Sequence, residues 1–225
     1  MTSPSPLALV VLISGSGSNL QALIDGALAG RLPIVIRAVI ANEADAFGLE
    51  RARRAGIEAQ VLNHHDFADR ASFDQALIAL IDSYRQELIV LAGFMRILTH
   101  DFVSHYQGRM INIHPSLLPK HRGLHTHQRV LDAGESEHGA TVHFVTEELD
   151  GGPAILQARV AVEEGDDASW LAKRVLTQEH LILPQVVRWF AQGRLWLDPD
   201  GIPRLDSVRL LQPLRFDGLS QEQLN

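Results

Sequence analysis

The sequence predicts an α/β protein built on a doubly wound, mostly parallel open sheet with helices on both faces and an antiparallel hairpin near the C-terminus. The continuous apolar run at 7–13 is typical of a strand buried on both faces, and the Val- and Ile-rich stretches at 33–42 and 87–93 are also expected to be strands. Stretches with helical spacing separate these runs, and strands that alternate with helices indicate a parallel sheet. A chain of 225 residues is long enough for one compact core.

The first predicted strand runs directly into a glycine loop. Residues 14–19 read SGSGSN, and the following LQALIDGALAG has helical spacing. A strand, a glycine loop and a helix together aim free backbone N–H groups at an anion. The loop is not GxxxxGK[ST], and Leu20 replaces the last glycine of GxGxxG, so nucleoside triphosphate and dinucleotide fingerprints both fail. A monophosphate is the better prediction, although a simple tight turn would also use these glycines.

The other predicted elements follow the same alternation of strand and helix. Further strands are expected at 57–62, 110–114, 138–146 and 153–162. Helices are expected at 46–55, 73–84, 101–106 and 170–190, with another helix opened by residues 123–127. Asp167 or Ser169 can cap the long helix, and Pro184 is expected to kink or break it. Residues 194–205 read as the hairpin. We therefore expect a disordered leader at 1–6, one domain at 7–205, and a tail at 206–225 without a functional signal.

Two pairs of histidines could suggest a metal site. His64 and His65 are adjacent, and on an extended chain adjacent side chains point to opposite faces, so we expect a solvated loop, with Asp66 or Asp69 capping the next helix. His125 and His127 diverge on a helix. The sequence therefore predicts no metal.

Three residues suit acyl-transfer chemistry. Asn112 and His114 are two apart on a predicted strand, so they share a face just before Pro115 breaks the strand. Open α/β sheets place ligands at this carboxyl end. Asn112 offers an amide donor for an oxyanion, His114 exchanges protons near neutral pH, and Asp150, in the turn sequence LDGGP, can orient or charge the imidazole. Alternatively, Asn112 and His114 are hydrogen-bonded core residues and Asp150 is a turn residue.

The order of the motifs favours the catalytic interpretation. SGSGSN, LAGFMRIL, NIHPSLLP, GLHTH and HGATVHFVTEELDGGPAILQ follow one another in this chain. From about residue 7 to 194 this series resembles the phosphoribosylglycinamide formyltransferases, a family of folate-dependent formyltransferases with a Rossmann-like core. The resemblance implies transfer of a formyl group from 10-formyltetrahydrofolate, a co-substrate, to the amine of glycinamide ribonucleotide in purine synthesis. It also implies that no metal is needed.

The resemblance assigns roles to residues of this chain. Asn112, His114 and Asp150 align with the catalytic triad of the family. Gly17, Ser18 and Asn19 align with the loop that holds the ribonucleotide phosphate, and Glu179 with the glutamate that binds the glycinamide substrate; from the residues alone, 178–180 read as a solvated helix face. The implied folate-binding residues are Arg70, Met95, Arg96, Ile97, Leu98, Thr146, Glu147 and Asp150. His121 and Arg122 depart from the more apolar or aromatic residues of the family at this place.

The composition of the chain excludes several classes of partner and chemistry. The formal net charge is −7, and an acidic surface argues against a nucleic-acid partner, which would need a basic stripe. The absence of cysteine excludes a thiolate nucleophile and a disulfide framework. The apolar run near the N-terminus is too short for a signal peptide or a membrane span, so we expect a soluble cytoplasmic protein that is a monomer or a homodimer.

Three rival functions share some of these features. A methionyl-tRNA formyltransferase would be expected to add a C-terminal domain and a basic surface. A formyltetrahydrofolate hydrolase would be expected to carry an N-terminal regulatory domain, and six residues precede the first predicted strand. A non-catalytic phosphate-binding module would explain the glycine loop but would leave Asn112, His114 and Asp150 without a role.

Overall fold

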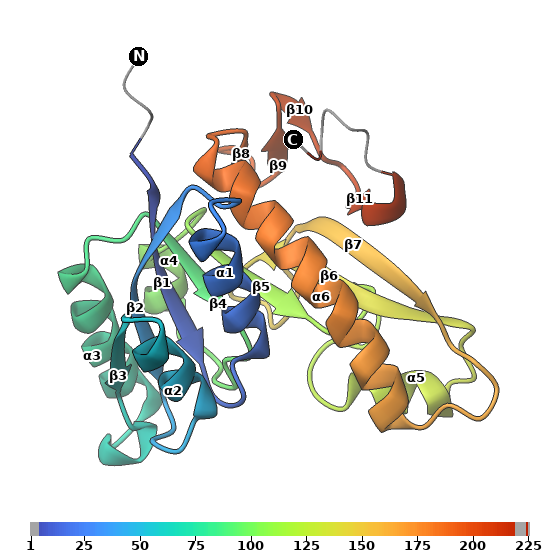
Figure 1. The fold of residues 1–225 in the computed structure, drawn as a ribbon, viewed down its shortest axis with the longest axis horizontal. Helices are drawn as coiled ribbons and strands as arrows, with labels where there is room; N and C mark the ends of the chain where they lie inside the picture. The colour runs from blue at the N-terminus through green and yellow to red at the C-terminus, as the bar shows by residue number, and fades with distance from the viewer. Residues whose placement is uncertain (1–4, 219–223, 225) are drawn as a thin grey trace.

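The centre of the protein is an eight-stranded sheet (Figure 1). The computed structural model describes residues 5–218 and 224. Within these residues, the sheet has the strand order β11-β7-β6-β5-β4-β1-β2-β3. Its strands are β1 (Leu7–Ile13), β2 (Ile34–Ala41), β3 (Glu58–Val61), β4 (Leu88–Leu91), β5 (Met110–His114), β6 (Glu137–Phe144), β7 (Ala154–Ala161) and β11 (Leu214–Arg215).

The sheet is mostly parallel, as predicted. Strands β1 to β5 pair in parallel with one another, whereas β6 runs antiparallel to both β5 and β7. Strand β11 returns to the parallel direction beside β7. Strand β5 therefore lies at the junction between a parallel half and a mixed half of the sheet.

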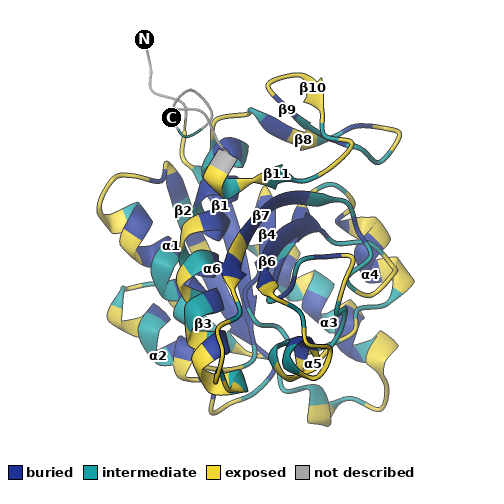
Figure 2. Cartoon of the chain, turned by 90° about the vertical axis from the view of Figure 1, so that its right-hand side faces the viewer, coloured by how far each residue is buried: buried dark blue, intermediate teal, exposed yellow. Residues whose placement is uncertain are grey.

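Helices cover both faces of the sheet, which confirms the doubly wound prediction. The helices are α1 (Ser18–Leu28), α2 (Phe47–Arg54), α3 (Arg70–Ser83), α4 (His100–His105), α5 (Thr126–Asp132) and α6 (Ala168–Ala191). Leu9 and Val11 of β1 join the core beneath α1, α2, α5 and α6, and Val10 and Leu12 join the core beneath α3 and α4. Alternation along a strand thus supplies two cores, and Figure 2 shows the buried strands between helices with exposed outer surfaces.

Helix caps account for several boundaries. Asp69 accepts a hydrogen bond from Ser72 N at 2.8 Å and caps α3, as expected. Asp167 caps α6 by accepting from Trp170 N at 2.8 Å. Pro184 lies inside α6, which continues from Ala168 to Ala191, so of the expected kink or break the break is wrong.

The expected geometry of the adjacent histidines is also wrong. Residues His64–Asp66 form a 3₁₀ helix, η1, whose first turn is capped by the Asn63 side chain. In this tight turn the imidazole rings of His64 and His65 lie on the same side, with centroids 3.9 Å apart and planes inclined by 37°. The two side chains therefore lie close enough to contact one ligand.

The C-terminal region contains the predicted hairpin and two further strands. Strands β8 (Leu195–Leu197) and β9 (Pro203–Leu205) pair antiparallel, and β10 (Val208–Arg209) extends them to a three-stranded sheet. The segment expected as a tail thus supplies β10, β11 and a short 3₁₀ helix, η2 (Phe216–Gly218). The first four residues of the predicted leader, and residues 219–223 and 225, lie outside the described residues. None of the helices in the described part is long and apolar enough to cross a membrane.

Candidate active site

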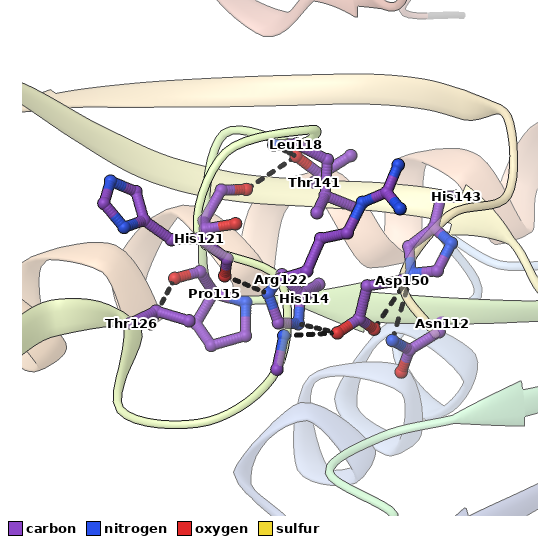
Figure 3. Close-up of polar contacts among 12 residues, drawn as sticks. Asn112, His114, Pro115, Leu118, His121, Arg122, Thr126, Thr141, His143 and Asp150 are labelled. Atoms are coloured by element: carbon purple, nitrogen blue, oxygen red, sulfur yellow. Dashed lines mark hydrogen bonds and ion pairs between the residues drawn. The ribbon is translucent and has the colours of Figure 1, made fainter. Parts of the chain in front are cut away.

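The carboxyl end of β5 presents Asn112 and His114 on the same side of the sheet, as strand alternation predicts. The Asp150 carboxylate, from the connection between β6 and β7, reaches the same place. Its Oδ2 lies 3.5 Å from Nδ1 of His114, and both side chains are less than a tenth exposed. Figure 3 shows Asp150 between His114 and Asn112. The structure therefore brings the three predicted catalytic residues together.

The backbone around Asp150 is shaped for this position. Asp150 adopts a left-handed conformation with φ of 48°, and its Oδ2 accepts a hydrogen bond from Gly123 N at 2.8 Å. At Gly152, a Cβ atom would lie 1.9 Å from the carbonyl oxygen of Phe144. Only glycine fits there, so the glycines of the LDGGP sequence allow the connection to fold back over β6.

The second ring nitrogen of His114 also faces an oxygen atom. Its Nε2 lies 3.0 Å from the carbonyl oxygen of His121. Because Nδ1 faces the Asp150 carboxylate, both N–H groups of an imidazolium would find acceptors. His121, itself at φ of 51°, is held by Glu135 at 2.8 Å. His114 thus contacts the backbone carbonyl of His121, and the His121 side chain points to Glu135 instead.

His143 belongs to the site but was missed in the sequence analysis. Its Nδ1 lies 2.9 Å from the carbonyl oxygen of Phe144, and its Nε2 lies 3.1 Å from Nδ2 of Asn112. Burial lowers the pKa of His143 to about 4, so the ring is neutral at pH 7. If Nδ1–H donates to the carbonyl, Nε2 accepts from the Asn112 amide and fixes its orientation. The feature that brings His143 to the site is the antiparallel register that pairs Asn112 with His143. The sequence alone does not reveal this register, because it depends on β5 and β6 being neighbours.

A cavity opens beside this constellation. Among the predicted folate-binding residues, its lining includes Arg96, Ile97, Leu98, Thr146, Glu147 and Asp150. Asn112 and His143 also line it, so the polar pair faces a groove with apolar walls. Arg70 starts α3 and is not among the lining residues, whereas Met95 lines the neighbouring cavity.

The segment between β4 and α4, which carries three of these residues, is tied down by Asp74. The buried Asp74 carboxylate accepts a hydrogen bond from Thr99 N at 2.6 Å. Burial raises the pKa of Asp74, and this hydrogen bond acts in the opposite direction. Helix α3 thus holds the segment that forms one wall of the groove.

The second cavity lies against the glycine loop. It is lined by residues 14–19, Ala92, Gly93, Met95, Leu176 and Glu179. Gly17 has φ of 67° and lies at the N-terminus of α1, so the loop and the helix N-terminus face the same cavity. The predicted phosphate-binding residues therefore share one cavity with the predicted glycinamide-binding glutamate.

Helix α2 fixes the shape of this loop. A Cβ atom at Gly17 would lie 2.6 Å from Cα of Gly48, so two backbones pack directly. Gly48 N donates to the carbonyl oxygen of Gly15 at 3.0 Å, and Arg51 Nε donates to that of Ser16 at 2.8 Å. With these carbonyl groups satisfied, the loop is held before any ligand arrives.

Glu179 is buried rather than part of a solvated helix face. Its Oε2 accepts a hydrogen bond from Asn19 Nδ2 at 2.6 Å. Burial raises the pKa of Glu179, although the hydrogen bond from Asn19 acts in the opposite direction. Asn19 Oδ1 is buried and has no hydrogen-bond partner among the residues that the structure describes, which leaves an acceptor for a polar ligand.

Replacing Glu179 with glutamine is expected to stabilise the protein at alkaline pH while weakening ribonucleotide binding. Because the folded-state pKa is raised, the wild-type carboxyl opposes folding as pH rises above its ordinary value of 4.5, and glutamine removes this effect. Urea unfolding at pH 8 and pH 5 should show a stability gain that shrinks toward pH 5. Loss of the carboxylate should raise the KM for the ribonucleotide about 10- to 100-fold.

The exposed Glu164 provides the matched control for this prediction. Glu164→Gln should change neither the pH dependence of stability nor the KM. A Glu179→Gln variant whose stability relative to wild type is the same at both pH values would contradict the buried, hard-to-ionise carboxyl.

Comparison with known proteins identifies relatives that are similar over most of this chain. The family model for formyl transferases matches residues 7–187. The phosphoribosylglycinamide formyltransferase of Escherichia coli is 56% identical over 202 residues, covering 87% of this chain and 95% of the relative. That of Haemophilus influenzae is 46% identical, covering 90% and 95%. The structure of the Coxiella burnetii phosphoribosylglycinamide formyltransferase superposes with a TM-score of 0.89 at 53% identity, covering 94% of this chain and 99% of that one.

Proposed function

The chain belongs to the formyl transferase family, and from this premise we propose that it is a phosphoribosylglycinamide formyltransferase of de novo purine biosynthesis. It transfers the formyl group of 10-formyltetrahydrofolate to the amine of glycinamide ribonucleotide and releases tetrahydrofolate. The observation that carries the proposal is the convergence of Asn112, His114 and Asp150 beside the apolar groove. That arrangement supplies a donor, a proton-exchanging ring and a carboxylate for acyl transfer.

The two cavities suit the two substrates. The glycine loop offers backbone N–H groups and a helix N-terminus to the ribonucleotide phosphate, through Gly17, Ser18 and Asn19. Glu179 on the same cavity would accept from the glycinamide part. The groove lined by residues 96–98 suits a flat heteroaromatic folate ring. Met95, the residue just before this segment, lines the other cavity, which is the one proposed for the phosphate.

In the proposed reaction the substrate amine attacks the formyl carbon directly. A new N–C bond forms, and the formyl oxygen becomes an oxyanion that accepts a hydrogen bond from the Asn112 amide and is stabilised by the positive charge of a protonated His114. When the tetrahedral intermediate collapses, the C–N bond to the folate breaks. The proton lost by the amine reaches the departing folate nitrogen with the help of Asp150 and water. No protein nucleophile and no metal takes part.

The expected contributions to lowering the activation free energy are sufficient for such a mechanism. Positioning of two bound substrates can contribute about 7–11 kcal/mol, and one oriented oxyanion donor about 3–4 kcal/mol. Asn112 is preoriented by the neutral His143, so its donor is in place before charge develops. Asp150 is held by Gly123, so its carboxylate stays beside His114 through the reaction.

We further propose that residues 7–205 form the catalytic domain of a cytoplasmic enzyme that acts as a monomer or homodimer. Its partners are the two small-molecule substrates, and the net charge of −7 fits a protein that does not bind nucleic acid.

The experiment that tests the proposed function follows the absorbance of 10-formyltetrahydrofolate with and without glycinamide ribonucleotide. We expect folate release that requires the ribonucleotide. Release at the same rate without the ribonucleotide would indicate a hydrolase, and binding of the ribonucleotide without any release would indicate a binding module. Either of these results would overturn the transferase proposal.

A further inference from the structure

We propose that Glu43, His64 and His65 form a binding site for a divalent transition-metal cation of the zinc class. One nitrogen from each imidazole and one carboxylate oxygen of Glu43 lie within 4.8 Å of one another. Glu43 lies two residues beyond β2, and the histidines follow β3 in η1. Because β2 and β3 are adjacent and parallel, their carboxyl ends bring the two loops together.

The donor set matches the chemistry of such cations. Zinc is bound by imidazole nitrogen and carboxylate oxygen, and two histidines with one acidic residue leave a position for water. The His64 imidazole already lies beside the Glu43 carboxylate, with 3.6 Å between its Nδ1 and Oε1 of Glu43. Rotation of the Glu43 side chain, which is 39% exposed, and of the exposed His65 can complete the coordination.

The surrounding residues hold the histidines in place. His64 Nδ1 lies 3.1 Å from the carbonyl oxygen of Asn42, a contact through which Nδ1–H would orient the ring, so that Nε2 is the nitrogen proposed to bind the cation. The ring of Phe73 packs edge-on against His64, with centroids 6.5 Å apart. Asn63 accepts from His65 N at 3.0 Å and fixes the turn that places both imidazoles on one side. Packing and capping thus fix the His64 ring and the turn that carries His65, while the exposed side chains of Glu43 and His65 keep the freedom to close on a cation.

The site lies next to the glycine loop but supplies no group to the proposed reaction. The Asn42 side chain contacts His64 Nδ1 at 3.2 Å through Nδ2 and accepts from Ser14 Oγ at 2.5 Å through Oδ1. Ser14 Oγ in turn accepts from Met95 N at 2.8 Å. A bound cation would therefore join the loops after β2 and β3 and stabilise the edge of the sheet on which the glycine loop rests.

The test is a titration of the full, tag-free chain with ZnCl₂ after chelator treatment, followed by calorimetry. We expect saturable binding of one zinc ion per chain at the site. His65→Ala, which removes an exposed ligand, and Glu43→Gln, which keeps the shape and removes the charge, should each weaken this binding about 10-fold or more. His105→Ala is the matched control, because His105 is also exposed and also pairs with a carboxylate, Asp82 at 2.9 Å. It should leave the affinity unchanged.

A second readout keeps a folding defect separate from a loss of metal binding. Wild type and variants should unfold at similar temperatures in chelator, and zinc should raise the midpoint of wild type and His105→Ala only. No saturable binding by wild type at roughly 100 µM zinc, or equal weakening by all three substitutions, would overturn the proposal and leave an ordinary histidine–glutamate ion pair. Because the readout is binding, the result does not depend on formyl transfer.

Discussion

The Asp150→Asn variant is expected to lose kcat by about 10³- to 10⁴-fold while keeping its fold. Asparagine keeps the size of the side chain and an oxygen that can accept from Gly123 N, so the connection between β6 and β7 remains in place. It removes the negative charge 3.5 Å from Nδ1 of His114 and offers no carboxylate for the proton transfer. Steady-state absorbance assays at saturating concentrations of both substrates measure the loss.

Two controls separate chemistry from structure in this prediction. Asp132→Asn changes an exposed aspartate on α5 and should retain wild-type kcat. The thermal midpoint of Asp150→Asn should lie within a few degrees of wild type. Near-normal turnover by a folded Asp150→Asn protein would rule out the assigned role.

Removing the Asn112 amide should be the next most damaging change. Asn112→Ala is expected to lower kcat about 10²- to 10³-fold, because one oriented donor to the oxyanion is lost. Because the substrates are proposed to bind mainly to the glycine loop and to the groove, both KM values should change much less than kcat. Single-turnover measurements with preformed ternary complex report the chemical step directly.

The control for Asn112 is another asparagine with a purely local contact. Asn63 accepts from His65 N and caps η1, away from the proposed reacting groups. Asn63→Ala should leave kcat unchanged. A rise in both KM values without a loss of kcat in Asn112→Ala would assign Asn112 to binding instead of to transition-state stabilisation.

Local patterns in the sequence predicted most of the parallel half of the sheet. The Val- and Ile-rich stretches reappear as β1, β2 and β4, because strands buried on both faces are made mostly of apolar residues; the exposed Arg37 is the exception in β2. Alternation placed Asn112 and His114 on one side correctly. The Asp69 and Asp167 caps were also predicted, since an N-cap depends on residues within one turn.

The features that were missed depend on which elements become neighbours. His143 enters the site because β6 pairs antiparallel with β5. Glu179 is buried because α6 packs on α1, which no polar pattern within 178–180 could indicate. Strand β11 is two residues long, too short for a sequence pattern, and it is a strand because it pairs with β7. His64 and His65 share a side because of a tight turn that the sequence suggested as an extended loop.

The contact between Asn19 and Glu179 joins positions 160 residues apart, and it has a consequence for the order in which the site is assembled during synthesis. A nascent chain that has emerged through Asp150 already contains the residues proposed for formyl transfer, but α6 has not yet been made. Until α6 packs against α1, the cavity at the glycine loop lacks the wall formed by Leu176 and Glu179. Synthesis therefore completes the cavity proposed for the ribonucleotide after the strand that carries Asn112 and His114, so we expect an unfinished chain without α6 to bind the ribonucleotide more weakly than the full chain does.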